Sequence, residues 1–532
     1  MHDEFYVVGS GPTGVAAAKA LLDAGLSVTM LDAGVSLEAS RQELLDETLR
    51  APAQNWNDKS LALFKAGTNA TSEGIPLKLA YGSDFPYRNA DQFVSSTSQV
   101  GIVPSLARGG FSNVWGAAVL PYRANDTGDW PFAIEELTPH YRAMLNLTGL
   151  AGSEDGLSKD FPLFIEPHQN LSTGSLVASL LSDMERFQNE LTDRGIRFGK
   201  SRLAVSKTNP NGFACASCNM CMYGCPYGLI YNSSDSLKAM TANPAFSYHP
   251  NVIVKTFHET AGGVEIRAYN CQNRKDVTFH ASRLFVAAGT LSTTRLVLES
   301  IGKNEPATLK DSQYFLLPLL RFSAPSHFRL NESAHTLAQA FIEILDTTCS
   351  EKSIHLQVYG YNELYPRAIR EKLGAFLANL SQPAIKEFLK RFLLLQGYLH
   401  SDYSHKIEAR LLPRTETSLT GKLALTVKQN PLTSITMDRL VKKLKSLKGL
   451  LRGFTLSPLL KMGSVGRGFH TGGSFPMSLA PQDNQTDILG RPYGYDRVHL
   501  VDSSVFPSIP ANTITLTAMA NAHRIAATAA AL

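Results

Sequence analysis

The first forty residues change from one apolar pattern to another in the order expected of a strand, a turn and a helix. Residues 5–8 form a short β-branched and aromatic run, which predicts a buried strand. Gly-Ser-Gly-Pro-Thr-Gly follows at 9–14, and an alanine-rich helical pattern covers 15–24. A second apolar run, 26–31, ends at Asp32. This order predicts a strand–turn–helix–strand unit of a parallel sheet.

The glycine turn has the spacing that a dinucleotide pyrophosphate requires. Gly9 allows the tight turn, Gly11 lets the backbone approach the phosphates, and Gly14 lets the helix pack on the strand. The helix then points its N-terminus at the phosphate charge. Asp32 follows about twenty residues later, where such a unit places the carboxylate that binds the adenosine ribose. The pattern predicts a dinucleotide site and does not distinguish NAD from FAD.

The pattern between residues 301 and 461 differs from that of the first forty residues. We expect five strands and two helices there, the strands at 314–322, 337–345, 354–361, 406–412 and 422–428, the helices at 368–380 and 384–395. An antiparallel sheet backed by helices is the natural arrangement of these elements. The expected fold class is therefore α/β: a Rossmann-like domain with a second α+β domain built on an antiparallel sheet.

Residues 439–467 combine a cationic and an apolar pattern. The segment holds eight Lys and Arg residues and no acid, and leucine or valine recurs at 440, 441, 444, 447 and 451. This spacing predicts a helix with one apolar and one cationic face. Two interpretations stay open: a helix of the second domain with a solvated face, or a peripheral attachment to an anionic membrane or to a lipid-linked substrate.

Composition and charge exclude several classes of protein. The 532 residues are 44% hydrophobic and 18% charged, which is globular rather than disordered. A net charge of +5 on this length is too small to indicate nucleic-acid binding. The longest apolar runs fall far short of a membrane span, and no signal-peptide pattern precedes residue 5. We expect a cytoplasmic protein without integral membrane segments.

Four of the six cysteines fall within eleven residues. Cys215, Cys218, Cys221 and Cys225 have the spacing C-x2-C-x2-C-x3-C-P, which is that of bacterial ferredoxin ligands. The run favours an iron–sulfur cluster. A zinc site and free or disulfide-linked thiols stay open as alternatives, although zinc ribbons separate their cysteine pairs by more residues.

The C-terminal motifs resemble those of a known family. His-Thr-Gly-Gly at 470–473, Val-Asp-Ser-Ser-Val-Phe-Pro at 501–507 and Pro-Ala-Asn-Thr at 510–513 precede a helical run. In this order they resemble the glucose–methanol–choline (GMC) family of FAD-dependent oxidoreductases. The glycine turn at 9–14 and the segments 108–116 and 284–296 agree with the same family.

The resemblance implies an FAD site built from distant parts of the chain. The ADP half is expected to be held by Gly9, Gly11, Gly14 and Asp32. The flavin and the pyrophosphate are expected to lie along Gly109, Gly110, Ser112 and Asn113. The resemblance also implies that Asp502 meets the ribityl-pyrophosphate segment and that Thr513 lies near the flavin. It also implies a discontinuous FAD-binding domain, 1–40, 95–125, 205–300 and 462–532, and a substrate domain with insertions, 41–94, 126–204 and 301–461.

The same resemblance assigns the chemistry. Oxidation of an alcohol needs a base for the hydroxyl proton, a path for hydride to flavin N5, and a hydrogen bond that orients the oxygen. We expect His470 to be the base and Asn512 to orient the oxygen. Segment 108–116 is closest to the pyranose oxidase branch, which favours a sugar or polyol substrate over a sterol or long-chain alcohol. Val114 stands where that branch has its flavin-linking histidine, which predicts non-covalent FAD.

Rival functions stay open at this point. If the cysteine run holds a cluster, reduced flavin gains a one-electron exit to an acceptor protein or a quinone. The chain could then be a flavin and iron–sulfur relay without an alcohol substrate of its own. A protein that binds NAD and zinc is a second rival.

Overall fold

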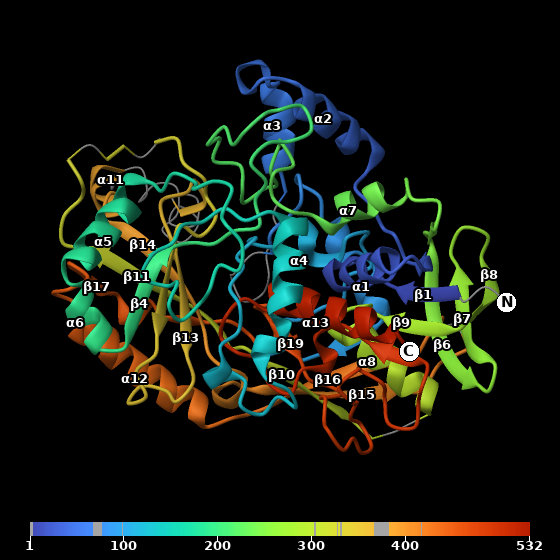
Figure 1. The fold of residues 1–532 in the computed structure, drawn as a ribbon. Helices are drawn as coiled ribbons and strands as arrows, with labels where there is room; N and C mark the ends of the chain where they lie inside the picture. The colour runs from blue at the N-terminus through green and yellow to red at the C-terminus, as the bar shows by residue number, and fades with distance from the viewer. Residues whose placement is uncertain are drawn as a thin grey trace.

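The computed structural model describes residues 4–67, 77–97, 99–302, 305–326, 328–329, 332–365, 382–416 and 418–532 (Figure 1). It is built around four sheets. The parallel sheet and its helices lie toward the two termini, and the largest antiparallel sheet lies at the other end of the molecule. The α/β fold class with a second antiparallel domain is therefore confirmed.

The parallel sheet draws its strands from both ends of the chain. Its order is β20 (Val498–Leu500), β9 (Arg283–Val286), β1 (Glu4–Val8), β2 (Ser27–Leu31) and β5 (Phe246–His249), and every neighbouring pair is parallel. Helix α1 (Pro12–Asp23) packs against α13 (Ile514–Ala529) beside this sheet (Figure 1). Alanine is the commonest residue at their buried positions, which lets the two helices approach closely.

A small antiparallel sheet and one helix complete this half of the molecule. Strands β6 (Val252–Thr260), β7 (Gly263–Asn270) and β8 (Lys275–Ala281) form the sheet. Helix α8 (Thr290–Ile301) follows β9 and packs on β6.

The largest antiparallel sheet forms the floor of the second half. Its order is β17 (Gly453–Thr455), β11 (Tyr314–Arg321), β14 (Phe392–Tyr398), β13 (Ile354–Tyr359), β12 (Ala340–Ile344) and β4 (Ile196–Lys200), with β18 (Lys461–Met462) beside β11. One face packs on α5 (Ser175–Arg186) and α12 (Leu432–Ser446) through a core that includes Phe315, Leu317 and Leu440. The opposite face looks toward the parallel sheet and becomes part of the site described below.

Two expectations about the second half need correction, and a third is untested. The predicted strands 406–412 and 422–428 exist as β15 (Lys406–Leu412) and β16 (Lys422–Lys428), but they belong to another sheet, with β19 (Thr471–Gly472), β10 (Ala307–Asp311) and β3 (Val94–Ser96). The predicted helix 384–395 is wrong in its second half. Helix α11 ends at Leu389, and β14 begins at Phe392. The predicted helix 368–380 lies outside the described residues.

The basic segment is helical only in its first part. Helix α12 ends at Ser446, and the rest of 439–467 forms turns together with β17 and β18. Among the described helices, none combines the length and the apolar character needed to span a bilayer. The remaining helices are α2 (Ala39–Arg50), α3 (Asp58–Lys65), α4 (Thr138–Thr148), α6 (Gln188–Asp193), α7 (Ser233–Met240) and α11 (Gln382–Leu389).

Candidate active site

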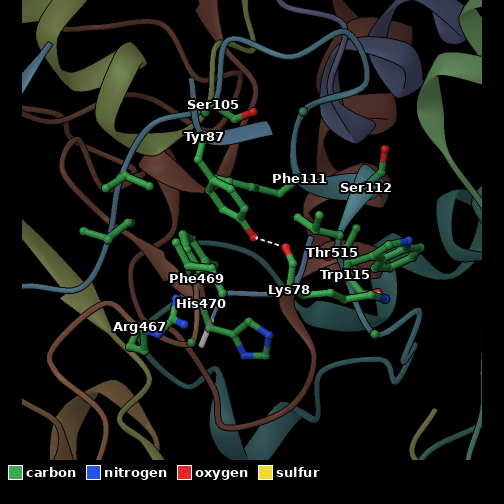
Figure 2. Close-up of a pocket in the computed structure, with 18 of the residues that line it drawn as sticks. Lys78, Tyr87, Ser105, Phe111, Ser112, Trp115, Arg467, Phe469, His470 and Thr515 are labelled. Carbon is green, nitrogen blue, oxygen red and sulfur yellow. Dashed lines mark hydrogen bonds between the residues drawn. The ribbon is translucent and has the colours of Figure 1, made fainter. Parts of the chain in front are cut away.

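One cavity of about 1430 Å³ lies between the parallel sheet and the largest antiparallel sheet. Its wall includes the first glycine turn and Asp32 from one end of the chain, and His470, Asp502 and Thr513 from the other. Figure 2 shows part of this wall, with His470 and Phe469 facing Lys78 and Trp115. The volume exceeds the roughly 300–1,000 Å³ that a single drug-sized ligand occupies. The cavity therefore has room for a cofactor and a substrate together.

The first glycine turn fits a pyrophosphate. Gly9 has φ +98°, and a Cβ there would lie 2.5 Å from the Ala287 carbonyl oxygen. A Cβ on Gly14 would lie 1.9 Å from the Gly9 carbonyl oxygen, so this glycine is required for helix α1 to pack on the turn. Gly11 lines the cavity, and nothing lies within 4 Å of its Cβ position. Gly11 is also the N-cap of α1 and makes no side-chain cap; Pro12 has no N–H, so the N–H groups of Thr13 and Gly14 are the ones available to an anion.

Asp32 lies at the end of β2, in the cavity wall. Its Oδ2 accepts hydrogen bonds from the Ser10 hydroxyl at 2.5 Å and the Tyr248 hydroxyl at 2.9 Å. Burial raises the pKa of this carboxyl, and the two hydroxyl donors oppose that shift. The carboxylate is thus held in place where an adenosine ribose would lie.

The second glycine segment is only partly in the cavity wall. Gly110 and Ser112 line the cavity, whereas Gly109 and Asn113 do not. The Gly109 N–H donates to Ser10 Oγ at 2.9 Å, and Asn113 Nδ2 donates to the Arg108 and Gly110 carbonyls. Gly109 and Asn113 therefore shape the loop, which presents Ser112 and the neighbouring Val114 to the cavity.

The C-terminal motif supplies a buried carboxylate and a helix N-terminus. Asp502 lines the cavity and accepts hydrogen bonds from the Gly289 N–H, the Ser504 N–H and the Thr293 hydroxyl. Burial raises its pKa. Thr513 is the N-cap of α13 and makes no side-chain cap to the helix, because its hydroxyl accepts from the Leu120 N–H instead. The N-terminal N–H groups of α13 are thus available at the cavity wall.

His470 lines the cavity from the loop before β19 (Figure 2). Its ring stacks on Tyr398, with centroids 4.5 Å apart and planes at 16°. Its Nδ1 is buried and has no hydrogen-bond partner. Burial, with a smaller effect of the nearby His355, lowers the pKa of His470 to about 3. The imidazole is therefore neutral at physiological pH.

Asn512 does not join His470 in the cavity wall. Its side chain is fully buried, and its Nδ2 donates to Glu343 Oε2 at 3.0 Å. The cavity wall includes its neighbour Thr513 and not Asn512 itself. The role of Asn512 in orienting a substrate oxygen stays a prediction, and in this arrangement its amide group is bound to Glu343.

Several residues near His470 could not be foreseen from the sequence. Glu343 and His355 form a fully buried pair at 2.5 Å, on neighbouring strands β12 and β13. Asp311 accepts hydrogen bonds from the Gly466 N–H and the Thr471 hydroxyl, and so fixes the loop that carries His470. Each of the three residues lies in a strand of ordinary apolar pattern, and only the pairing of strands brings them together.

The cysteine run gives no support to a metal cluster. All four cysteines are free thiols, and within the described part of the chain no group of three or more His, Cys, Asp or Glu side chains could hold a metal ion. Burial raises the pKa of Cys218 to about 12 and of Cys225 to about 11, which keeps these thiols protonated. The Leu229 N–H donates to the Cys225 sulfur at 3.4 Å. The four cysteines thus lie in the structure as half-buried free thiols.

The low pKa of His470 predicts an unusual pH profile. An ordinary histidine base, with a pKa near 6.5, would lose about 30-fold in activity on going to pH 5, because its neutral form falls to a few per cent. With a pKa of about 3, His470 stays neutral over that interval. We expect kcat/KM for an alcohol to show no imidazole limb between pH 8 and pH 5 in steady-state assays.

Asp311→Asn is the control for this profile, because burial raises the pKa of Asp311 to about 7. A limb near pH 7 that disappears in the variant belongs to Asp311. A limb near pH 6.5 that persists in the variant would contradict the neutral imidazole.

Comparisons with known proteins agree with this architecture. Residues 457–522 match the family model described as GMC oxidoreductase. The crystal structure of pyridoxine 4-oxidase from Mesorbium loti superposes with a TM-score of 0.57 at 12% sequence identity, over 99% of this chain and 99% of that chain. No curated protein sequence matches the chain.

Fold and site together show an α/β protein whose main cavity lies between a parallel sheet and an antiparallel sheet. The matched segment contains His470, Asp502 and Asn512. Segment 457–522 thus matches the GMC oxidoreductase family, and the fold of the whole chain is similar to that of pyridoxine 4-oxidase.

Proposed function

We propose that the protein oxidises an apolar alcohol by hydride transfer to FAD held in the cavity, with His470 as the base. The observation that carries the proposal is the neutral imidazole of His470 in the wall of a cavity that is also lined by the first glycine turn and by Asp502. No other described histidine lines this cavity.

The residues present fit FAD. The open backbone at Gly11 and the uncapped N-terminus of α1 suit the pyrophosphate, and Asp32 suits the adenosine ribose. The uncapped N-terminus of α13 suits the electron-rich edge of the isoalloxazine. Val114 offers no nucleophile, so FAD would be held without a covalent bond. When bound, FAD supplies the acceptor for the hydride of the alcohol carbon.

The protein's own contribution is a positioned proton acceptor. A neutral imidazole takes the hydroxyl proton as the C–H bond breaks. Tyr398 fixes the plane of the ring by stacking, and Asp311 fixes the loop at Gly466 and Thr471 on either side of it. The Thr513-headed helix α13 adds a positive dipole end beside the same space.

The wall beyond His470 favours an apolar alcohol over the sugar or polyol expected from segment 108–116. The antiparallel sheet contributes aromatic and aliphatic side chains to the wall, namely Tyr314, Leu316, Pro318, Tyr359, Phe392 and Leu394. Its amides there are Gln357 and Gln396. Besides these amides and the tyrosine hydroxyls, this part of the wall offers a polyol few hydrogen-bonding groups, and each hydroxyl group left without a partner would cost about 1–3 kcal/mol.

Anaerobic mixing with an alcohol panel tests the proposal. Flavin absorbance should bleach with long-chain or polycyclic alcohols and remain with glucose, glycerol and other polyols. The rates should follow the apolar surface of the alcohol, since apolar burial contributes about 25 cal/mol per Å². If only sugars bleached the flavin, the proposed substrate class would be wrong. If no alcohol bleached it, the proposed function would be refuted.

The rival function, a relay of electrons between a flavin and an iron–sulfur cluster, would use the cysteine run as the exit. We do not adopt it, because the described residues around that run contain no group suited to a metal ion. A relay protein would keep its yellow flavin with every free alcohol of the panel, which separates the two functions in the same experiment.

A further inference from the structure

One face of the largest antiparallel sheet runs from His470 to the surface of the molecule. Side chains of paired strands that stand opposite each other share a face, and alternate residues along a strand return to it. Tyr314 pairs with Tyr398, the residue that stacks on His470. Along β11 the same face then carries Leu316, Pro318 and Leu320, ahead of Phe322. Eight residues of strand correspond to about 26 Å.

This face is apolar except beside Leu316, where Gln396 stands on one side and Lys461 on the other. Opposite Pro318 stands Leu394, and opposite Leu320 stand Phe392 on one side and Phe454 on the other. Leu316, Pro318, Leu394 and Phe392 line the cavity. The apolar wall of the cavity is therefore continuous, through Leu320, with the outer end of the sheet.

The outer end is exposed to solvent. Phe322 is 46% exposed and Phe454 is 41% exposed, and their ring centroids lie 6.3 Å apart. Leu459 is 59% exposed and also lines the cavity, so the cavity wall reaches the surface at this place. We call Phe322, Phe454 and Leu459 the apolar rim. In Figure 1 this part of the sheet, marked by β17, lies at the end of the molecule away from the termini.

Cationic side chains surround the apolar rim. Arg452 is exposed, and its carbonyl accepts a hydrogen bond from the Phe322 N–H. The carbonyl of Lys448 accepts a hydrogen bond from the Gly453 N–H, next to Phe454. Arg391 precedes Phe392 in the chain. Within the described residues none of these three side chains has an ion-pair partner. Segment 439–467 contains no acid. The rim thus combines exposed aromatic rings with uncompensated positive charge.

We propose that the apolar rim docks on an anionic phospholipid membrane, from which an apolar alcohol enters the cavity along the sheet face. The docking is argued from the apolar rim alone. The identity of the substrate that enters rests on the proposed function. Aromatic side chains insert at the boundary of headgroups and acyl chains, while arginine and lysine bind the anionic headgroups. A second copy of the chain is a poorer occupant, because a two-fold interface would bring the same cationic side chains against one another.

Co-sedimentation with vesicles tests the docking without any alcohol. The holoenzyme should partition onto phosphatidylcholine vesicles that contain roughly one third phosphatidylglycerol, and much less onto phosphatidylcholine alone. Raising the salt from about 0.1 M to about 1 M should weaken the binding, since the Debye length falls from about 10 Å to about 3 Å. The double variant Phe322→Ser/Phe454→Ser should lose about tenfold or more in partition.

Three further measurements on variants serve as controls for the vesicle-binding experiment. Leu479→Ser/Tyr493→Ser removes side chains that are 78% and 60% exposed in the segment before β20, and it should bind vesicles like the wild type. Lys448→Glu/Arg452→Glu should abolish the preference for anionic vesicles. Bleaching by a short, water-soluble alcohol should stay unchanged in the Phe322→Ser/Phe454→Ser variant, which separates docking from catalysis. Equal binding of all variants, or a dimer that this variant dissolves, would overturn the proposal.

Discussion

His470→Ala is expected to reduce the rate of flavin bleaching by an alcohol about 100- to 10,000-fold, the usual contribution of a general base. The flavin absorbance of the resting enzyme should stay unchanged, because the groups suited to the ADP half lie in the first glycine turn and at Asp32, in the parallel-sheet half of the molecule. Anaerobic stopped-flow absorbance at the flavin band measures both quantities on one sample.

The exposed His258 on β6 is the matched control, since His258→Ala removes the same side chain from a surface position. Its bleaching rate should equal that of the wild type. If His470→Ala retained FAD and bleached at the wild-type rate, the proton would have to go to another group and the assignment of the base would fail.

Gly11→Ala is expected to deprive the enzyme of FAD while leaving the fold intact. Its Cβ would meet nothing within 4 Å in the protein, and the N-cap backbone there, at φ −64°, suits alanine. The methyl group would instead enter the space where the pyrophosphate approaches the backbone. The purified variant should be colourless, with a circular dichroism spectrum like that of the wild-type protein stripped of its flavin.

Gly14→Ala is the contrasting substitution, because it should disturb the fold and not the cofactor site alone. Its Cβ would lie 1.9 Å from the Gly9 carbonyl oxygen, so α1 would have to move off the sheet. We expect loss of soluble protein or a clearly lower Tm, with several kcal/mol of destabilisation as for other overpacked sites. A yellow Gly11→Ala protein would show that the cofactor approaches the turn differently.

The sequence was most informative where local chemistry is decisive. A glycine turn needs its glycines whatever surrounds it, so strand, turn, helix and Asp32 were placed correctly from the order of residues alone. The same holds for the strand before Asp502 and for helix α13 after Thr513. These elements carry most of the residues that line the cofactor end of the cavity.

Prediction failed where strand pairing decides the outcome. Residues 392–395 are apolar in either a helix or a buried strand, and only the positions of β11 and β13 on either side favour the strand. The direction of the Asn512 side chain depends on Glu343, which is 169 residues away in sequence. The apolar character of the substrate end likewise comes from the register of the sheet, which no local pattern specifies.

The contact between α1 and α13 ties the beginning of the chain to residues about five hundred positions later. During synthesis, β1 and β9 can pair as soon as residue 286 has emerged, but β9 then keeps an open edge until β20 is delivered. The cofactor cleft consequently cannot close until translation is nearly finished. Such long-range closure is slow, and it leaves the nascent protein dependent on protection of that edge.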